Sequence, residues 1–437
     1  MAKLPLSKKV LYGIGQLGVT IPSFFLSTYI FVFYSPLNGE KILSASLVGT
    51  AVFLGTLVQA LANPFIGSWS DKLNFKIGRR RFFIITGTIP LALFFALVWL
   101  PPFEGFIMAV LLFFYLISFN FLFAYVVLPY LALIPEISTE SDDRVVLTTI
   151  SAYFSITGII LASILPTILL MFKFSLSSVG IILALIALIS YLIVFFSIKE
   201  NPEIKNIPKE YSILKAFLQT FKNKTFNRYI LAYLFFQFGF YFFLSSLGYF
   251  VENIVMPGNP NFETYIGLFT LMAVIFTIIF SPLLVRYTKK KGEKKAFILF
   301  TFILGLVMML TSLLGLTKII NNFVQMALLM VFAGLGLTSY FILPNAILSE
   351  IIDEDELITG YRREGMYFGV QGFLERIPSG LSGFVLGIWI SYLYYPTLND
   401  LYIRLLGVIG GVSVLITALL FIFVPLKQDI KKRNLVK

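Results

Sequence analysis

Long apolar segments without charge constrain the fold of this chain more than any other feature. No charged residue lies between Val10 and Tyr34, between Ser44 and Ser70, between Phe106 and Pro135, or between Val145 and Phe172. Each segment is at least as long as the ~20 residues that a helix needs to cross the hydrocarbon core of a bilayer. The segments lack the alternation of barrel strands, so we predict membrane-spanning helices.

Twelve such helices fit the hydropathy of the whole chain. The predicted spans are 10–34, 45–69, 82–100, 106–134, 146–172, 178–198, 228–254, 264–286, 296–316, 322–349, 366–392 and 401–425. We therefore expect an all-α polytopic membrane protein with two six-helix bundles, residues 1–198 and 228–437, joined by a polar cytoplasmic linker at 199–227. The first span is too long for the core of a signal peptide, and we interpret it as retained.

An internal repeat relates the two halves of the sequence. Residues 128–137 resemble residues 343–352, and this match pairs Glu136 with Glu350 at an offset of 214. Residues 78–84 resemble 292–298 at the same offset, and a Tyr-x-x-x-Gln-x-Gly pattern at 12–18 recurs at 233–239. Two related halves in a membrane protein usually flank a central cavity, which is typical of transporters that work by alternating access. We expect the solute to bind near the midplane between them.

Basic residues predict the orientation of the chain in the membrane. Of the 34 Lys and Arg residues, 29 fall in the tails and in the loops that share a side with the termini. This bias places both termini in the cytoplasm of a plasma-membrane protein. The net charge of +12 then follows from topology and from attraction to anionic lipid. No soluble basic domain exists to bind nucleic acid.

Cysteine and histidine are both absent from the sequence. Disulfides, histidine proton relays and metal sites built from these residues are therefore excluded. An alternative is a divalent-metal cluster at 353–355, but no second acidic cluster accompanies it. We predict neither a metal nor a cofactor.

Two segments carry a family resemblance. The pattern Gly67-x-x-x-Asp71-Lys72, followed by Gly78 and three arginines, resembles the loop motif of the major facilitator superfamily. The run from Leu343 to Gln371, with its acidic cluster and Arg-Arg pair, resembles the glycoside–pentoside–hexuronide:cation symporter family. That family includes melibiose permease, with plant sucrose carriers and animal lysolipid carriers as more distant relatives. The resemblance implies the major facilitator fold and a solute carrier.

The resemblance also implies a charged cytoplasmic gate. Glu350, Asp353 and Glu356 recur at a spacing of three, so they share a helix face if that helix continues. The alternative is a solvated acidic loop without a role. The predicted gate residues are Asp71, Arg79, Glu136, Arg144, Glu350, Asp353, Glu356 and Arg362.

The first half lacks the carboxylates that such symporters use. In the family, helix II carboxylates bind the coupling cation, whereas Gln59 and Asn63 stand at these places here. The sugar-binding carboxylates of helices I and IV are replaced by Thr20 and Val127. We therefore expect no carboxylate sodium site. The two amides could coordinate Na⁺ weakly, bind a polar solute, or only join helices.

The second half carries a charged pair within a predicted span, Glu375 and Arg376. A charge at this depth costs at least ~2.5–3.5 kcal/mol, so function is the default interpretation. Arg376 matches the place of a lysine beside the cation site in melibiose permease-like carriers. It could hold an anionic or hydroxyl-rich solute or replace the cation, and the alternative is structural pairing. Glu375 is the deep carboxylate available for a coupling proton, and Glu252 is a weaker candidate.

These observations together predict a monomeric secondary transporter for a glycoside or similar polyhydroxy solute, proton-coupled or uncoupled. The alternative is a carrier or flippase of an amphipathic, lipid-like solute. An enzyme is disfavoured because no soluble domain is present. The predicted solute-binding residues are Gln16, Thr20, Gln59, Asn63, Asn120, Tyr125, Gln237, Tyr241, Asn345, Gln371 and Arg376.

Overall fold

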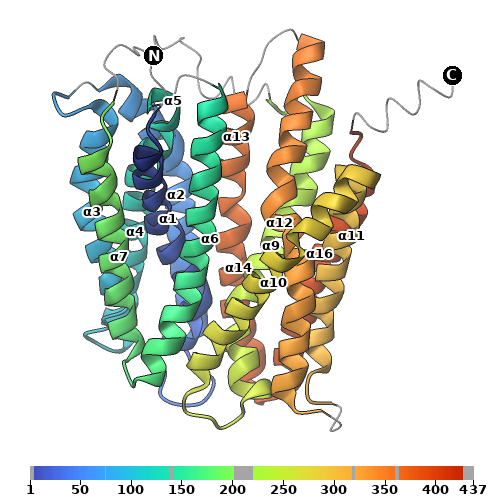
Figure 1. Cartoon of the computed structure of the whole chain (residues 1–437). Helices are drawn as coiled ribbons and strands as arrows, with labels where there is room; N and C mark the ends of the chain where they lie inside the picture. The colour runs from blue at the N-terminus through green and yellow to red at the C-terminus, as the bar shows by residue number, and fades with distance from the viewer. Residues whose placement is uncertain are drawn as a thin grey trace, which may run out of the picture. The chain divides into compact units, whose positions relative to one another are not determined.

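The computed structural model describes residues 4–73, 75–137, 141–200, 220–316, 320–359 and 364–426. Within this part, twelve helices are long and apolar enough to cross a membrane, which confirms the predicted spans. Figure 1 shows these helices as long rods joined by short connections.

The chain divides into two compact units. Unit 1 comprises Met1–Lys209 with Asn261–Leu268, and unit 2 comprises Glu210–Pro260 with Phe269–Lys437. The helices of unit 1 are α1 (Leu6–Tyr34), α2 (Ala45–Lys72), α3 (Arg79–Val98), α4 (Gly105–Ala132), α5 (Ile134–Ile137), α6 (Ser141–Met171) and α7 (Leu176–Ser197). Helix α10 (Phe262–Lys291) begins in unit 1 and continues in unit 2.

Unit 2 contains the remaining helices. They are α9 (Lys224–Phe250), the π-helix η1 (Val251–Val255), α11 (Glu293–Leu310), the 3₁₀-helix η2 (Thr311–Leu313), α12 (Asn322–Thr359), α13 (Glu364–Leu374), α14 (Arg376–Trp389), the π-helix η3 (Ile390–Tyr394), α15 (Tyr395–Thr397) and α16 (Asp400–Ile422). The predicted linker at 199–227 lies mostly outside the described residues, and α9 already begins at Lys224. The boundaries that we expect for the two bundles stay a prediction.

Small residues let the first and last long helices of each unit pack closely. A Cβ atom added to Gly18 of α1 would lie 2.5 Å from the Tyr191 ring on α7. The repeat equivalent, Gly239 of α9, would place its Cβ atom 2.7 Å from the Gly410 carbonyl oxygen on α16. Helices in membranes associate through such small-residue contacts. The Tyr-x-x-x-Gln-x-Gly repeat therefore marks the same helix contact in both units.

The second repeat pair also has a structural counterpart. Gly78 and Gly292 directly precede α3 and α11, with φ values of 107° and 89°. This left-handed region favours glycine because a side chain would clash with the backbone. The glycine in each copy thus permits the tight turn into the next spanning helix.

Helix interruptions distinguish the units. In unit 1, α4 ends at Ala132 and the short α5 follows Leu133, whereas α12 of unit 2 runs unbroken to Thr359. In unit 2, α13 and α14 are separated at Glu375, whereas α6 of unit 1 is unbroken. Each interruption precedes a proline, Pro135 or Pro378, and the repeat places Ser349 at the position of Pro135.

Proline lacks the N–H group that would bond to the carbonyl four residues earlier, and its ring crowds that carbonyl. At Pro378 this carbonyl belongs to Leu374, the last residue of α13. Other prolines, Pro64, Pro129, Pro282 and Pro344, lie inside continuous helices. Local context therefore decides whether a proline ends a helix.

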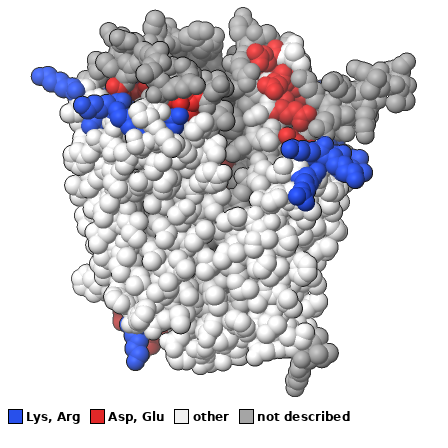
Figure 2. All heavy atoms as spheres, viewed as in Figure 1, with Lys and Arg blue, Asp and Glu red and all other residues white. Residues whose placement is uncertain are grey.

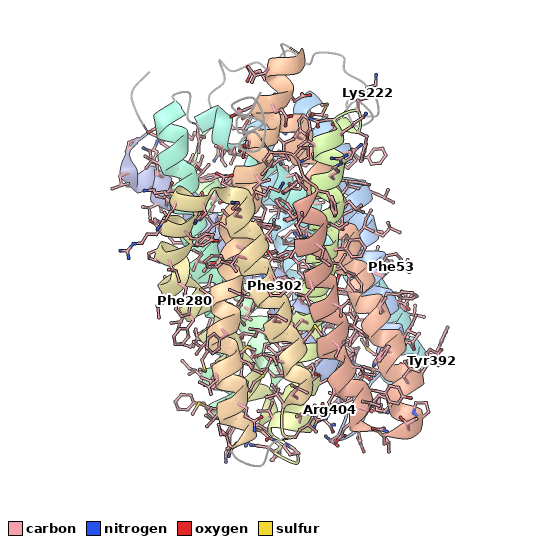
Figure 3. All side chains as sticks on the ribbon, turned by 90° about the vertical axis from the view of Figure 1, so that its right-hand side faces the viewer. Phe53, Lys222, Phe280, Phe302, Tyr392 and Arg404 are labelled. Atoms are coloured by element: carbon pink, nitrogen blue, oxygen red, sulfur yellow. The ribbon has the colours of Figure 1, made fainter. Side chains whose placement is uncertain are left out.

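Charged side chains lie at the helix ends. Figure 2 shows most of the described acidic and basic residues near the upper end and a smaller group near the lower end, with uncharged surface along the length of the helices. Figure 3 places Lys222 and Arg404 at opposite ends of unit 2, with Phe280 and Phe302 on the apolar faces of α10 and α11 between them. This distribution suits a multi-pass membrane protein.

Candidate functional site

A stripe of polar side chains runs along α9 in unit 2. Tyr229, Tyr233, Gln237 and Tyr241 recur at a spacing of four, which places them on one face of the helix. This face packs against α14, where Glu375 and Arg376 lie beside the interruption, and the stripe also contacts Gln371 of α13. The arrangement concentrates polar chemistry within an otherwise apolar bundle.

Glu375 accepts hydrogen bonds from this stripe. Its Oε2 atom lies 3.3 Å from the Tyr233 hydroxyl and 3.5 Å from Nε2 of Gln237. Nε2 of Gln237 also donates to the Tyr233 hydroxyl at 2.6 Å. These three side chains form one network, in which the carboxyl group can gain or lose a proton while keeping partners.

Arg376 lies next to this network without joining it. Its guanidinium interacts electrostatically with Glu375, Tyr241 and Tyr340. Among the described residues, no ion pair or hydrogen bond involves Arg376, and its Nε atom is buried without a partner. Adjacent helical residues point ~100° apart, which explains why Glu375 and Arg376 do not pair with each other.

A second set of hydrogen bonds fixes the Tyr229 end of the stripe. The Tyr229 hydroxyl lies 2.9 Å from Oε1 of Gln371 and 3.1 Å from the Pro344 carbonyl oxygen. The ring of Tyr229 stacks on that of Tyr233 at a centroid distance of 5.8 Å. Helices α9, α12 and α13 are thus joined by one hydroxyl group.

Aromatic rings flank the Arg376 side of the stripe. The Tyr340 ring of α12 stacks on Phe240 at 4.4 Å and on Phe236 at 5.3 Å. The Tyr340 and Tyr241 hydroxyls lie near each other. Tyr241, Tyr340 and Phe240 are half-buried.

The predicted unit 2 residues thus divide into two groups. Gln237, Tyr241, Gln371, Glu375 and Arg376 lie together in the cluster just described. Asn345 is exposed on α12 and makes no hydrogen bond through its side chain among the described residues. The spacing of four between Tyr229, Tyr233 and Gln237 could have identified both tyrosines as candidate site residues from the sequence. No sequence pattern pointed to Tyr340.

The predicted unit 1 residues are dispersed over several contacts. Gln16 accepts a hydrogen bond from Ser155 of α6 at 3.3 Å, and Thr20 packs against Gly158 of the same helix. Gln59 is buried and Asn63 is half-buried on α2, and neither amide bonds to another described residue. Their proposed role in solute binding stays a prediction.

Two other unit 1 candidates make local contacts. Asn120 donates to the Leu116 carbonyl oxygen of its own helix at 2.8 Å and packs against Gly55 of α2. Tyr125 shares a hydrogen bond of 3.0 Å with Thr86 of α3. These contacts join helices within unit 1.

An ion-pair network lies at the end of unit 1 that contains α5. Glu136 Oε1 lies 2.7 Å from Nη2 of Arg79 and 3.2 Å from Nε of Arg80. Arg80 also donates to the Ser70 hydroxyl at the end of α2. Arg80 and Glu136 are buried, so their charges stabilise each other in a poorly screened environment.

Glu200 completes this network from the far end of α7. Its carboxylate accepts three backbone N–H bonds, from Arg79 at 2.9 Å, Arg80 at 2.8 Å and Arg81 at 2.7 Å. Burial raises the pKa of Glu200, and the nearby Glu136 adds to this effect, while the three backbone bonds oppose it. The carboxylate caps the N-terminus of α3, where the helix dipole favours negative charge.

A second buried ion pair joins Lys9 of α1 to Asp143 of α6. Asp143 also accepts the backbone N–H of Leu4. Sequence reasoning missed both Asp143 and Glu200, because each lies in a polar segment where charge is expected and neither falls in a family motif.

The predicted gate residues of unit 2 lie on one helix. Because α12 continues to Thr359, Glu350, Asp353 and Glu356 occupy successive turns of it. Glu350 interacts electrostatically with Glu293 at the start of α11. The Arg362 residue and the side chains of Asp71 and Arg144 lie outside the described part of the structure. Their roles stay predictions.

The comparisons with known proteins agree with this architecture. A model of the MFS/sugar transport protein family matches residues 11–428. An isoprimeverose transporter of Lactiplantibacillus pentosus is 25% identical, over 89% of this chain and 80% of that protein. The sodium-dependent lysophosphatidylcholine symporter 1 of Xenopus tropicalis is 20% identical, over 99% of this chain and 89% of that protein.

A solved structure supports the fold. The crystal structure of a D-xylose-proton symporter superposes with a TM-score of 0.70, at 14% identity, over 96% of this chain and 98% of that one. At this identity the likeness concerns the fold alone. The predicted resemblance to sugar symporters of the major facilitator superfamily is confirmed by the family model and by relatives that are themselves transporters. The chain belongs to the MFS/sugar transport protein family and is a twelve-helix secondary membrane transporter.

Proposed function

We propose that this protein carries a glycoside or a similar polyhydroxy solute across the membrane by alternating access. The observation that carries the proposal is the polar cluster of Tyr233, Gln237, Glu375 and Arg376 within the apolar helices of unit 2. Buried polar groups in membrane helices are costly, and they mark solute and ion pathways. Hydroxyl, amide and carboxyl groups together match the donors and acceptors of a sugar.

The cluster also supports proton coupling through Glu375. This carboxyl group has two hydrogen-bond donors, Tyr233 and Gln237, and a cation, Arg376, close by. Both protonation states of the carboxyl group have partners, which suits a group that takes up a proton on one side and releases it on the other. An uncoupled carrier is the alternative within the same function.

Sodium coupling through the first half is disfavoured by its residues. Gln59 and Asn63 offer amide oxygens where the family has carboxylates, and a hard cation needs ligand charge for tight binding. In the described part of the chain, no group of three or more acidic residues could hold a metal ion. The same proposal includes a monomer in the plasma membrane. The charge bias of the loops supports an orientation with both termini in the cytoplasm.

Uptake into proteoliposomes tests the proposal. A radiolabelled methyl glucoside and methyl xyloside should enter liposomes that contain the protein faster than empty liposomes. A pH gradient, alkaline inside, should drive accumulation, and Glu375→Gln should leave equilibration without accumulation. Accumulation driven by Na⁺ that survives Gln59→Ala and Asn63→Ala would contradict the coupling scheme, and uptake without accumulation in the unmodified protein would identify a uniporter.

An amphipathic, lipid-like solute is a second candidate. The relative from Xenopus tropicalis that is a lysophosphatidylcholine symporter favours it, as does the apolar Val127 at a position where sugar symporters place a carboxylate. Thermal stabilisation by lysophosphatidylcholine, without stabilisation by any glycoside, would establish this candidate in place of the first.

A further inference from the structure

The last turns of α10 carry basic side chains on the surface of unit 2. Arg286, Lys289, Lys290 and Lys291 are exposed, and so is Lys295 in the first turn of α11. Within the described residues, none of these five side chains forms an ion pair or a hydrogen bond. Figure 2 shows a group of basic side chains at the upper right, where α10 ends in Figure 1. Their charge is therefore available to a partner outside the chain.

The acidic residue of the same turn is directed away from these cations. The Tyr287 ring of α10 lies 5.9 Å from the Phe300 ring of α11 by centroid distance, and Gly292 allows the tight turn between the two helices with its φ of 89°. Glu293 follows directly, and it faces Glu350 on α12. Its Oε2 atom is buried, so this carboxyl group lies inside unit 2 rather than among the exposed cations.

The corresponding turn of unit 1 uses its cations inside the protein. Arg79 and Arg80 form ion pairs with Glu136, and Arg81 donates to the Phe195 carbonyl oxygen at 2.8 Å. A turn of this kind can therefore satisfy its basic residues from within its own unit. Among the described residues, the turn of unit 2 does not, which indicates an external partner.

One exposed face of α10 changes from apolar to basic along its length. Ile275, Ile279 and Leu283 recur at a spacing of four and are 41%, 56% and 50% exposed. Because each residue of an α-helix turns by about 100°, Arg286 and Lys290 point within about 20° of the direction of Ile279. The five side chains thus form one stripe, with three apolar members followed by two cations.

A phospholipid presents the same order of chemistry along its length. The helical rise places Arg286 about 4.5 Å beyond Leu283, and Lys290 about 6 Å beyond Arg286. An acyl chain that packs along Ile279 and Leu283 would therefore bring its phosphate to the level of the two cations. Arginine binds phosphate oxygens through paired N–H donors, and lysine binds them as a point charge. A soluble anion would match the cations but leave the apolar part of the stripe unused.

We infer that Arg286 and Lys290 hold the phosphate of an anionic phospholipid whose acyl chain packs along Ile279 and Leu283. The site prefers a lipid of net negative charge to a zwitterionic one, because the ammonium group of a zwitterionic lipid would add a positive charge beside the two side chains. This lipid is a bound partner of unit 2 on its outer surface, and the inference is independent of the solute that the protein carries.

Matched lipids test the inference. Binding of phosphatidylglycerol and of phosphatidylcholine with identical acyl chains is measured by native mass spectrometry on the purified full-length protein in a non-ionic detergent. Phosphatidylglycerol should bind at least about tenfold more tightly, since two cations near the headgroup act together. Raising the ionic strength to about 0.5 M should weaken this preference, because salt screens exposed charges. Glycerophosphoglycerol, which is the headgroup without acyl chains, should bind at least about tenfold more weakly than the lipid.

Two double variants with equal loss of charge assign the preference to the stripe. Arg286→Gln with Lys290→Gln should reduce the preference for phosphatidylglycerol to about twofold or less. The matched control is Lys289→Gln with Lys291→Gln, in the same turns of α10. These side chains point about 80° and 120° away from Ile279, so the control should keep at least about half of the preference. The preference is a ratio of two affinities on one sample, so it does not depend on how much of a variant is folded.

Each contrary result has a definite meaning. Equal losses in the two double variants would show a general attraction to a charged helix end, which overturns the inference. Equal binding of the two lipids overturns it as well. Glycerophosphoglycerol that binds as tightly as the lipid would identify a site for a soluble phosphate ester and would overturn the lipid assignment. None of these results bears on the proposed sugar-carrier function.

Discussion

The two units share a repeat but place opposite chemistry at equivalent positions. In unit 1, Arg79 lies after Gly78 and pairs with Glu136, whereas in unit 2, Glu293 lies after Gly292 and faces Glu350. In unit 1, Gln16 accepts a bond from the neutral Ser155, whereas Gln237 in unit 2 donates to Glu375. The two units therefore share the backbone contacts of the repeat but differ in the charges at equivalent positions.

The two units therefore differ in where their charged residues lie. Unit 1 concentrates its paired charges at the helix ends, where they hold α2, α3, α5 and α7 together. Unit 2 places a carboxylate and a guanidinium beside an interruption in the middle of a span. We expect unit 1 to contribute mainly to the stability of the gate and unit 2 to solute and proton binding.

The largest expected effect concerns the two glutamates that start this comparison. Glu136→Gln should lower the free energy of unfolding by about 3 kcal/mol, because Arg79 and Arg80 would lose the buried carboxylate that they share. Glu293→Gln should leave it unchanged or raise it by up to ~1 kcal/mol, because it removes a repulsion between carboxylates. Chemical denaturation in detergent measures both, with the exposed Glu104→Gln as control. Equal losses in both variants would remove the distinction between the units at this position.

The two glutamines of the repeat give the next effect. Gln237→Leu should reduce the initial rate of glycoside uptake at least about tenfold, because it removes hydrogen bonds to Tyr233 and Glu375. Gln16→Leu should reduce uptake less than about threefold, since Gln16 bonds to the neutral Ser155 at the longer distance of 3.3 Å. Uptake is normalised to the amount of reconstituted protein. A larger loss at Gln16 would move the solute site toward unit 1.

The helix interruption at Glu375 offers a third test. Pro378→Ala restores the N–H donor for the Leu374 carbonyl, so α13 and α14 should join and the melting temperature should rise. Uptake should fall about threefold or more, because Glu375 and Arg376 would turn relative to α9. Pro166→Ala, inside the continuous α6, serves as the matched proline control. Unchanged uptake in Pro378→Ala would show that the interruption has no role in transport.

The smallest effect concerns the pH dependence of the Glu200 cap. Its pKa in the folded protein is raised above the ordinary value of 4.5, so the folded state binds this proton more tightly than the unfolded chain does. Protonated Glu200 therefore contributes to the free energy of unfolding below pH 4.5. This contribution is lost as pH rises through the raised pKa of Glu200. Melting temperatures at successive pH values should show this decline in the unmodified protein relative to Glu200→Gln. Parallel curves for the two proteins would contradict it.

Much of the architecture was predictable, because the length of an apolar segment can be read from the sequence of that segment alone. Segments such as 10–34 and 106–134 have no charge to place outside the bilayer, so a spanning helix is the one solution that satisfies their backbone. The arginines at 79–81 and the pair at 375–376 could also be identified, since charges next to or inside such segments are conspicuous. Tyr340 could not, because the chain has 22 tyrosines and no local pattern separates this one.

The sequence by itself determined the twelve spans, the internal repeat and the residues that carry charge, since these follow from composition and order along the chain. Only the tertiary structure decided which partners the charges have. Glu200 reaches Arg79 from 121 positions away, and Glu375 turns toward Tyr233 and Gln237 while Arg376 keeps an unbonded donor. Pairing depends on helix packing and on where a helix is interrupted, and neither is encoded in any single segment.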